Sequence, residues 1–122
     1  MTTRVLVVDD SAMVRDLHAL MLRGGGFDVR QASNGCEALE LLLADRFDLI
    51  VSDVNMPKMD GLELTRRLRA TAGYETAPVI LVSTEAEARD RVLGLRAGAN
   101  VYVVKPARAA DLLLHARMLL GR

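Results

Sequence analysis

Apolar residues follow two alternating patterns along the chain. Short uninterrupted apolar runs are typical of buried strands, whereas longer segments in which apolar residues recur every three or four positions are typical of amphipathic helices. Gly and Pro residues separate the segments. In chain order, the predicted strands are 5–8, 27–32, 49–53, 79–82 and 101–104, and the predicted helices are about 11–23, 35–44, 61–70, 85–97 and 109–120.

Polar residues before three helical segments are suited to cap them. Ser11 precedes the first helix, Asn34 or Gly35 opens the second, and Asp60 precedes the third. Apolar residues recur at helical spacing in three of the predicted helices. In the first helix they are Met13, Leu17, Leu20 and Met21. The inner face of the second helix is formed by Ala38, Leu39, Leu42 and Leu43, and that of the last helix by Ala109, Leu112, Leu113, Ala116 and Leu120.

Regular alternation of strands and helices predicts an α/β fold. Successive strands would pair in parallel through right-handed crossovers, with helices on both faces of the sheet. We expect a doubly wound, flavodoxin-like fold with five parallel strands in the order 2-1-3-4-5. The order is inferred from the number of elements. A chain of 122 residues fits one domain, 1–122.

Composition narrows the classes of function. Sixteen basic and sixteen acidic residues give a formal net charge of zero, so the net charge does not favour direct binding to nucleic acid or to a membrane. The apolar runs are far shorter than the roughly twenty residues of a membrane span. Cys36 is the only cysteine, which excludes an internal disulfide and suits a reducing cytoplasm, the expected location.

The stretch 48–61, DLIVSDVNMPKMDG, organises the prediction. It is a short buried strand that delivers Asp53 to a loop containing Pro57 and Gly61. The first strand likewise ends in Asp9 and Asp10. In the expected strand order these two strands are neighbours, and ligands of open α/β sheets bind where the order reverses. Three carboxylates gathered there would repel one another unless a divalent hard cation such as Mg²⁺ joined them.

Two further polar residues end predicted strands at the same edge. Ser83 supplies a hydroxyl and Lys105 a positive charge. With a metal ion they would form a receptor for a phosphoryl group, which Asp53 could attack to form an acyl phosphate. The alternative is that strand-end Asp residues only cap helices and form turns. Asp60 fits that alternative, and Asn55 fits either a turn or a metal-binding carbonyl.

The motifs VLVVDDS, DVNMPKMDG, LVST, GAN and YVVKP, which extend over essentially the whole chain, resemble those of bacterial response-regulator receiver domains, most similarly the single-domain chemotaxis type. The resemblance implies that Asp53 accepts a phosphoryl group from the phosphohistidine of a sensor histidine kinase or phosphotransfer domain. It also implies a Mg²⁺ ion held by Asp9, Asp10, Asp53 and the Asn55 carbonyl.

The same resemblance implies roles for residues near the later strands. Ser83, Thr84 and Lys105 would contact the phosphoryl oxygens, Ser83 and Tyr102 would form the switch, and the bond before Pro106 would be cis. Three positions depart from the usual pattern: Ser83 replaces the more frequent Thr, Thr84 replaces Ala or Gly, and Ala107 replaces an aromatic residue.

An output surface is expected on the face made by the fourth helix, fifth strand and fifth helix. Leu114 and Met118 lie off the inward stripe of the last helix, and Arg91 lies on the fourth helix. They are expected to contact a downstream protein partner, although ordinary surface exposure is the alternative. The protein would be a monomer or a weak dimer. His18 and His115 are expected on helices away from the strand ends.

Three functions compete. The first is a signalling switch in two-component or chemotaxis signalling, which is no enzyme beyond its own phosphorylation and dephosphorylation. The second is a phosphohydrolase with an Asp nucleophile, which generally needs an acidic group two residues further on, where this chain has Asn55. The third is a receiver-like scaffold that never accepts phosphate. The sequence leaves the kinase, the output partner and the lifetime of the phosphorylated state open.

Overall fold

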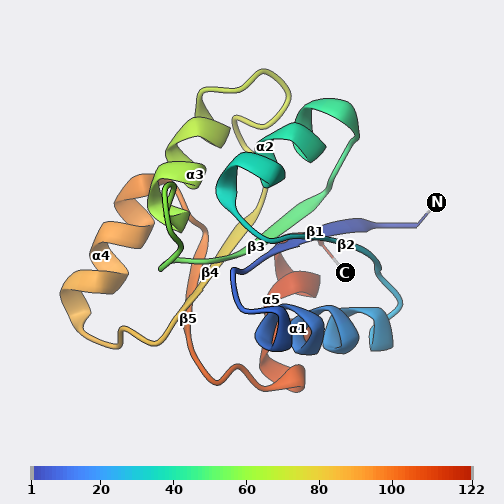
Figure 1. The fold of residues 1–122 in the computed structure, drawn as a ribbon. Coiled ribbons are helices and arrows are strands. Elements are labelled where there is room, and N and C mark those ends of the chain that lie inside the picture. The colour runs from blue at the N-terminus through green and yellow to red at the C-terminus, as the bar shows by residue number, and fades with distance from the viewer. Residues whose placement is uncertain (1, 122) are drawn as a thin grey trace.

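A five-stranded parallel sheet forms the centre of the computed structural model, which describes residues 2–121 (Figure 1). The strand order is β2-β1-β3-β4-β5, which confirms the predicted order and fold class. In register, Val8 pairs with Ser52 of β3, and Asp53 pairs with Val82 of β4. The strands are β1 Arg4–Val8, β2 Asp28–Ala32, β3 Leu49–Asp53, β4 Val79–Ser83 and β5 Val101–Val104.

Five helices cover the two faces of the sheet. Helices α1 and α5 lie on one face and α2, α3 and α4 on the other (Figure 1). Predicted caps hold three helix starts, where Ser11, Asn34 and Asp60 accept hydrogen bonds from the backbone three residues further on. The helices are α1 Ala12–Gly24, α2 Gly35–Ala44, α3 Gly61–Arg69, α4 Ala88–Ala97 and α5 Ala109–Leu119.

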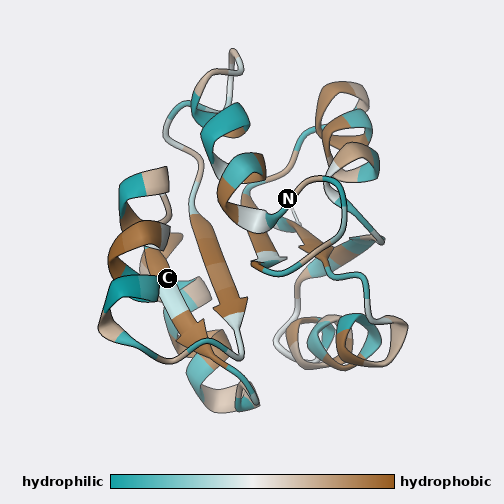
Figure 2. Cartoon of the chain, turned by 60° about the vertical axis from the view of Figure 1, so that its left-hand side comes forward, coloured by the Kyte–Doolittle hydropathy of each residue, from teal (hydrophilic) through white to brown (hydrophobic). Residues whose placement is uncertain are grey.

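Each face of the sheet carries its own core because successive strand residues point to opposite sides. Leu6 and Ile50 face α2 and α3, whereas Val7 and Leu49 face α1 and α5, and all four are fully buried. Burial of one such side chain stabilises the fold by about 1.5–3 kcal/mol. The central strands are therefore mostly apolar, while the helices carry both hydrophobic and hydrophilic residues (Figure 2).

The apolar periodicity correctly predicts α1 but marks the wrong face. Met13 and Leu17 are 82% and 47% exposed, and Leu20 is 68% exposed. The buried face instead carries Ala19 and Leu22, together with His18. The same correction applies to Leu43 of α2, which is 75% exposed, and to Ala109 of α5, which is also exposed.

Helix α4 begins at Ala88, three residues later than predicted. The backbone of Glu85 is held outside the helix, since its N–H donates to the Ser83 hydroxyl and its carbonyl accepts from the Tyr102 hydroxyl. Asp90 then accepts a hydrogen bond from the Glu87 N–H at 3.2 Å and fixes the start of the helix. Within residues 2–121 no helix has the length and apolar character needed to cross a membrane.

Candidate functional site

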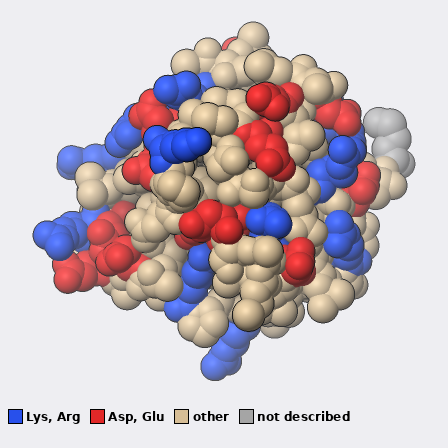
Figure 3. Space-filling model, viewed as in Figure 1, with Lys and Arg blue, Asp and Glu red and all other residues tan. Residues whose placement is uncertain are grey.

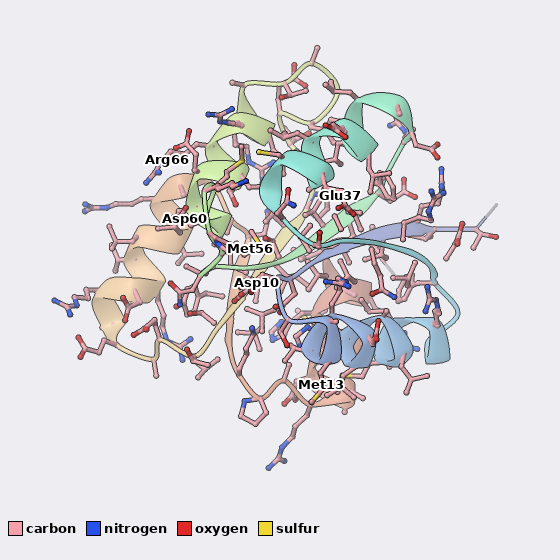
Figure 4. The ribbon with its side chains drawn as sticks, in the orientation of Figure 1. Asp10, Met13, Glu37, Met56, Asp60 and Arg66 are labelled. Atoms are coloured by element: carbon pink, nitrogen blue, oxygen red, sulfur yellow. The ribbon has the colours of Figure 1, made fainter. Side chains whose placement is uncertain are left out.

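Three acidic side chains meet where β1 and β3 leave the sheet. Asp9 and Asp10 follow β1, and Asp53 is the last residue of the neighbouring β3. One carboxylate oxygen from each lies within 4.8 Å of the other two. Figure 4 shows Asp10 at this end of β1, and Figure 3 shows acidic atoms gathered near the middle of the same face. The sequence prediction that these three residues converge is confirmed.

The three carboxylates differ in burial. Asp9 and Asp53 are 1% and 6% exposed, whereas Asp10 lies at the surface. Asp9 is fixed by the start of α1, since its Oδ1 accepts a hydrogen bond from the Ser11 N–H at 2.9 Å. Its carbonyl accepts another from Arg15 Nη1 at 2.8 Å. Asp9 and Asp53 thus form a rigid, buried floor, and Asp10 borders solvent.

Lys105 joins the two buried carboxylates. Its Nζ donates to Asp9 Oδ2 and to Asp53 Oδ1, both at 3.0 Å. Burial alone would lower the pKa of this lysine, but the hydrogen bonds to Asp53 and Asp9 outweigh burial and raise it. The ammonium is therefore a fixed positive charge opposite the acidic cluster. The peptide bond between Lys105 and Pro106 is cis.

The site raises the pKa of the Asp53 carboxyl. Burial is the largest cause, the negative charges of Asp9 and Asp10 add to it, and the hydrogen bond from Lys105 acts against it. Because one ammonium does not balance three carboxylates, the cluster favours a further positive charge. The carboxylate oxygens could hold a metal ion, and an all-oxygen donor set of this kind suits a hard divalent cation such as Mg²⁺.

The loop after Asp53 depends on a close approach of two backbone segments. Gly61, the first residue of α3, donates its N–H to the Val54 carbonyl at 2.8 Å. A Cβ at Gly61 would lie 2.2 Å from the Asp53 carbonyl oxygen, well inside contact distance. Glycine is therefore required there, and it sets the path of the loop. Asn55 lies exposed in this loop, two residues beyond Asp53.

Ser83 and Tyr102, the two predicted switch residues, meet at the backbone of Glu85. The fully buried Ser83 accepts a hydrogen bond from the Glu85 N–H at 3.0 Å, and the Tyr102 hydroxyl donates to the Glu85 carbonyl at 2.8 Å. Both residues therefore form hydrogen bonds to one short segment between β4 and α4. Thr84, within that segment, is exposed.

The Tyr102 ring is buried against α4. It is 7% exposed, and a Cβ at Gly94 would lie 2.8 Å from its Cδ2. The Arg91 guanidinium lies 5.8 Å from the centre of the ring, within the range of a cation–π contact. The ring thus occupies a space that exists because Gly94 has no side chain.

His18 lies beside the site, contrary to the expectation that it is remote from the strand ends. It is 3% exposed and lines a cavity of about 310 Å³ together with Lys105 and Thr84. Burial lowers the pKa of His18, and the field of Lys105 lowers it further, while that of Asp9 acts against both. The four-residue spacing of Val14, His18 and Leu22 was the signal for this buried face.

The predicted output residues are accessible. Leu114 and Met118 of α5 are 55% and 67% exposed. Three apolar residues of α4 are also exposed, namely Val92, Leu93 and Leu95, with exposed fractions of 45%, 47% and 50%. Basic and acidic side chains are both scattered over the face shown in Figure 3. Cys36, the single cysteine, is exposed.

The doubly wound parallel sheet defines an α/β protein, and the acidic cluster with its lysine makes the reversal of strand order the candidate ligand site. Residues 5–117 match the response regulator receiver domain family, and the chain belongs to this family. It is therefore a receiver domain of two-component signalling.

Known proteins similar to this chain include longer response regulators and isolated receiver domains. The response regulator MprA of Mycobacterium ulcerans is 42% identical over all 122 residues, which cover 52% of that protein. The chain thus spans about half the length of the curated relatives it matches. Among solved structures, chemotaxis protein CheY4 of Vibrio cholerae aligns with a TM-score of 0.93 and 34% identity over 98% of this chain and 99% of that one.

A receiver domain of a signal transduction histidine kinase from Syntrophus aciditrophicus is similar too. Its TM-score is 0.90 and its identity 36%, over 98% of this chain and 91% of that one. The fold and the family are therefore shared with proteins of different overall organisation.

Proposed function

We propose that the chain is a phosphoacceptor switch in which Asp53 receives a phosphoryl group from the phosphohistidine of a sensor histidine kinase or phosphotransfer domain. A carboxylate oxygen of Asp53 attacks phosphorus, the phosphorus–nitrogen bond breaks, and the leaving imidazole keeps the electron pair and takes up a proton. The contact that supports this best is the ammonium of Lys105, held 3.0 Å from both Asp9 and Asp53.

Mg²⁺ would neutralise charge as the phosphoryl group transfers, and Asp9, Asp10, Asp53 and the Asn55 carbonyl are the groups proposed to hold it. Asp9 would orient this set, because its other oxygen is fixed by the Ser11 N–H. Lys105, Ser83 and Thr84 would donate hydrogen bonds to the phosphoryl oxygens.

Release of a hydrogen bond provides a route from the acceptor to the output face. If Ser83 turns its hydroxyl toward a phosphoryl oxygen, the Glu85 N–H loses its present acceptor. The Glu85 carbonyl, which accepts from the Tyr102 hydroxyl, belongs to the same segment, so the hydrogen bonds that hold this segment in place would change. Helix α4 follows this segment directly, so its position relative to β5 and α5 would respond.

The output face is proposed to bind a downstream protein through Arg91, Leu114 and Met118. Replacement of Leu114 and Met118 by Ser should abolish partner binding and leave phosphorylation unchanged. Leu43→Ser is the matched control, since Leu43 is also an exposed apolar residue, 75% exposed, but lies on α2. Equal binding by the double variant and by the control would contradict this part of the proposal.

Intact mass spectrometry tests the acceptor. The protein is incubated with Mg²⁺ and a small phosphodonor, alongside Asp53→Asn and a sample with a chelator. A single phosphoryl adduct that is absent from the variant and from the chelated sample supports the switch. Continued turnover of phosphate esters would instead indicate a hydrolase. The absence of an adduct with any histidine kinase would indicate a scaffold.

A further inference from the structure

A cavity of about 310 Å³ lies between α1 and the segment that joins β5 to α5. These segments lie next to each other at the lower edge of Figure 1. Val14 and Leu17 form one wall, and Pro106 and Ala107 form the other. The volume is near the lower end of the roughly 300–1,000 Å³ of small-molecule sites. Such a space accommodates one or two fused rings.

His18 gives this mostly apolar cavity a buried polar side chain. The residue is 3% exposed and faces the cavity. Among residues 2–121 no hydrogen bond to its imidazole is found, and the nearest charged groups, Asp9 and Lys105, bond to each other. Buried polar side chains are normally hydrogen-bonded, so an imidazole placed in this way is suited to bind a group that enters the cavity.

The surrounding charges select a neutral ligand. The Lys105 ammonium is shared by Asp9 and Asp53, so an anion in the cavity would have to compete with two buried carboxylates for it. A cation would lose its water against mostly apolar walls that include the Lys105 ammonium, while none of the three carboxylates of the site lines the cavity. A neutral molecule meets neither cost.

We propose that this cavity binds a small neutral aromatic molecule that carries one hydroxyl or N–H group. Its ring would lie between Val14, Leu17, Pro106 and Ala107, and its polar group would form a hydrogen bond with the His18 imidazole. Lys105 and Thr84 line the same cavity, so the ligand would lie directly beside the acceptor site. Binding itself requires no phosphorylation, so the test below does not depend on the proposed function.

Amide NMR titration of the complete chain tests the site, with phenol and indole as probes and benzene as the probe without a polar hydrogen. Saturable shifts should concentrate at Val14, Leu17 and Ala107. Phenol should bind about fivefold more tightly than benzene, since one neutral hydrogen bond contributes about 1 kcal/mol. Replacement of His18 by Phe should remove this difference between the two probes.

Two substitutions at the walls test the location. Ala107→Phe fills the cavity and should weaken phenol binding at least about tenfold, whereas Ala110→Phe, at an exposed position on α5, should change it less than about twofold. Leu17→Asp should weaken phenol binding as well. Because Leu17 is 47% exposed, this variant still tests the site if Ala107→Phe does not fold. Circular dichroism verifies that each variant is folded.

Two results would overturn the proposal. One is unchanged phenol affinity in folded Ala107→Phe or in Leu17→Asp. The other is the absence of saturable shifts at the cavity with both phenol and indole, in which case its occupant would be sought among side chains of a protein partner instead.

Discussion

Replacement of Lys105 by Met tests whether one ammonium holds the acidic site together. The side chains of Asp9, Asp53 and Lys105 are 1%, 7% and 14% exposed, so the two ion pairs are largely shielded from water. Loss of one partner of a buried pair costs about 3–5 kcal/mol, because the remaining charge is left uncompensated. Since Asp10 borders solvent, we expect a smaller loss of unfolding free energy, about 2–3 kcal/mol at pH 7 without Mg²⁺.

The pH dependence distinguishes lost charge from lost packing. The pKa of the Asp53 carboxyl is already raised by burial and by Asp9, and without Lys105 it should rise further. A carboxyl whose folded pKa exceeds its unfolded pKa stabilises the fold at low pH and loses that contribution as pH rises through the folded value. The Lys105→Met variant should therefore regain stability as pH falls from 7 toward 5.

Urea denaturation at several pH values, with and without Mg²⁺, measures these effects. If Mg²⁺ binds the folded state at these carboxylates, as proposed, it should restore much of the stability of Lys105→Met. Lys58→Met is the matched control, since Lys58 is exposed and has no carboxylate partner within 4 Å among the described residues. A loss below about 1 kcal/mol, or a loss that is the same at every pH, would refute the reasoning.

Three further predictions concern other parts of the site. Gly61→Ala should lower the unfolding free energy by at least about 2 kcal/mol in urea titrations, because its Cβ would meet the Asp53 carbonyl, whereas Gly24→Ala, with open space around it, should not destabilise the protein. Gly94→Ala should displace the Tyr102 ring, seen as lost NOEs between Tyr102 and Leu81, although alanine alone would favour the helix by about 0.5–1 kcal/mol; a ring that stays in place would contradict this. His18 has a lowered pKa, so its contribution to stability is complete above pH 6.5 and is lost as pH falls through the folded value; thermal melts of His18→Gln should lack this acid-dependent part.

The strands and the acidic cluster were predictable because the sequence marks them locally. A strand covered on both faces is an apolar run, and the residue that ends the run lies at the edge of the sheet. Leu49 to Asp53 shows both features, with every residue buried and the carboxylate last. Once the strand order places β1 beside β3, parallel pairing brings Asp9 and Asp53 together.

The buried face of α1 was not predictable in the same way. Two stripes of the helix carry apolar residues, and the exposed stripe holds Met13 and Leu17, which are larger than the buried Ala19. The hydrophobic signal therefore favours the exposed stripe. The start of α4 was missed for another reason, since it depends on a hydrogen bond from Tyr102, seventeen residues along the chain from Glu85.

The charge of the site explains why a divalent cation would matter for switching. The three carboxylates and one ammonium carry minus three plus one, or two net negative charges. Phosphorylation of Asp53 would replace one negative charge by about 1.5–2. Lys105 alone cannot offset this increase, because both carboxylates that it contacts already share its ammonium. A divalent cation at the acidic edge would bring the resting cluster to neutrality and free Lys105 to follow the phosphoryl oxygens. The proposed switch therefore depends on the metal for its phosphorylated state more than for its fold.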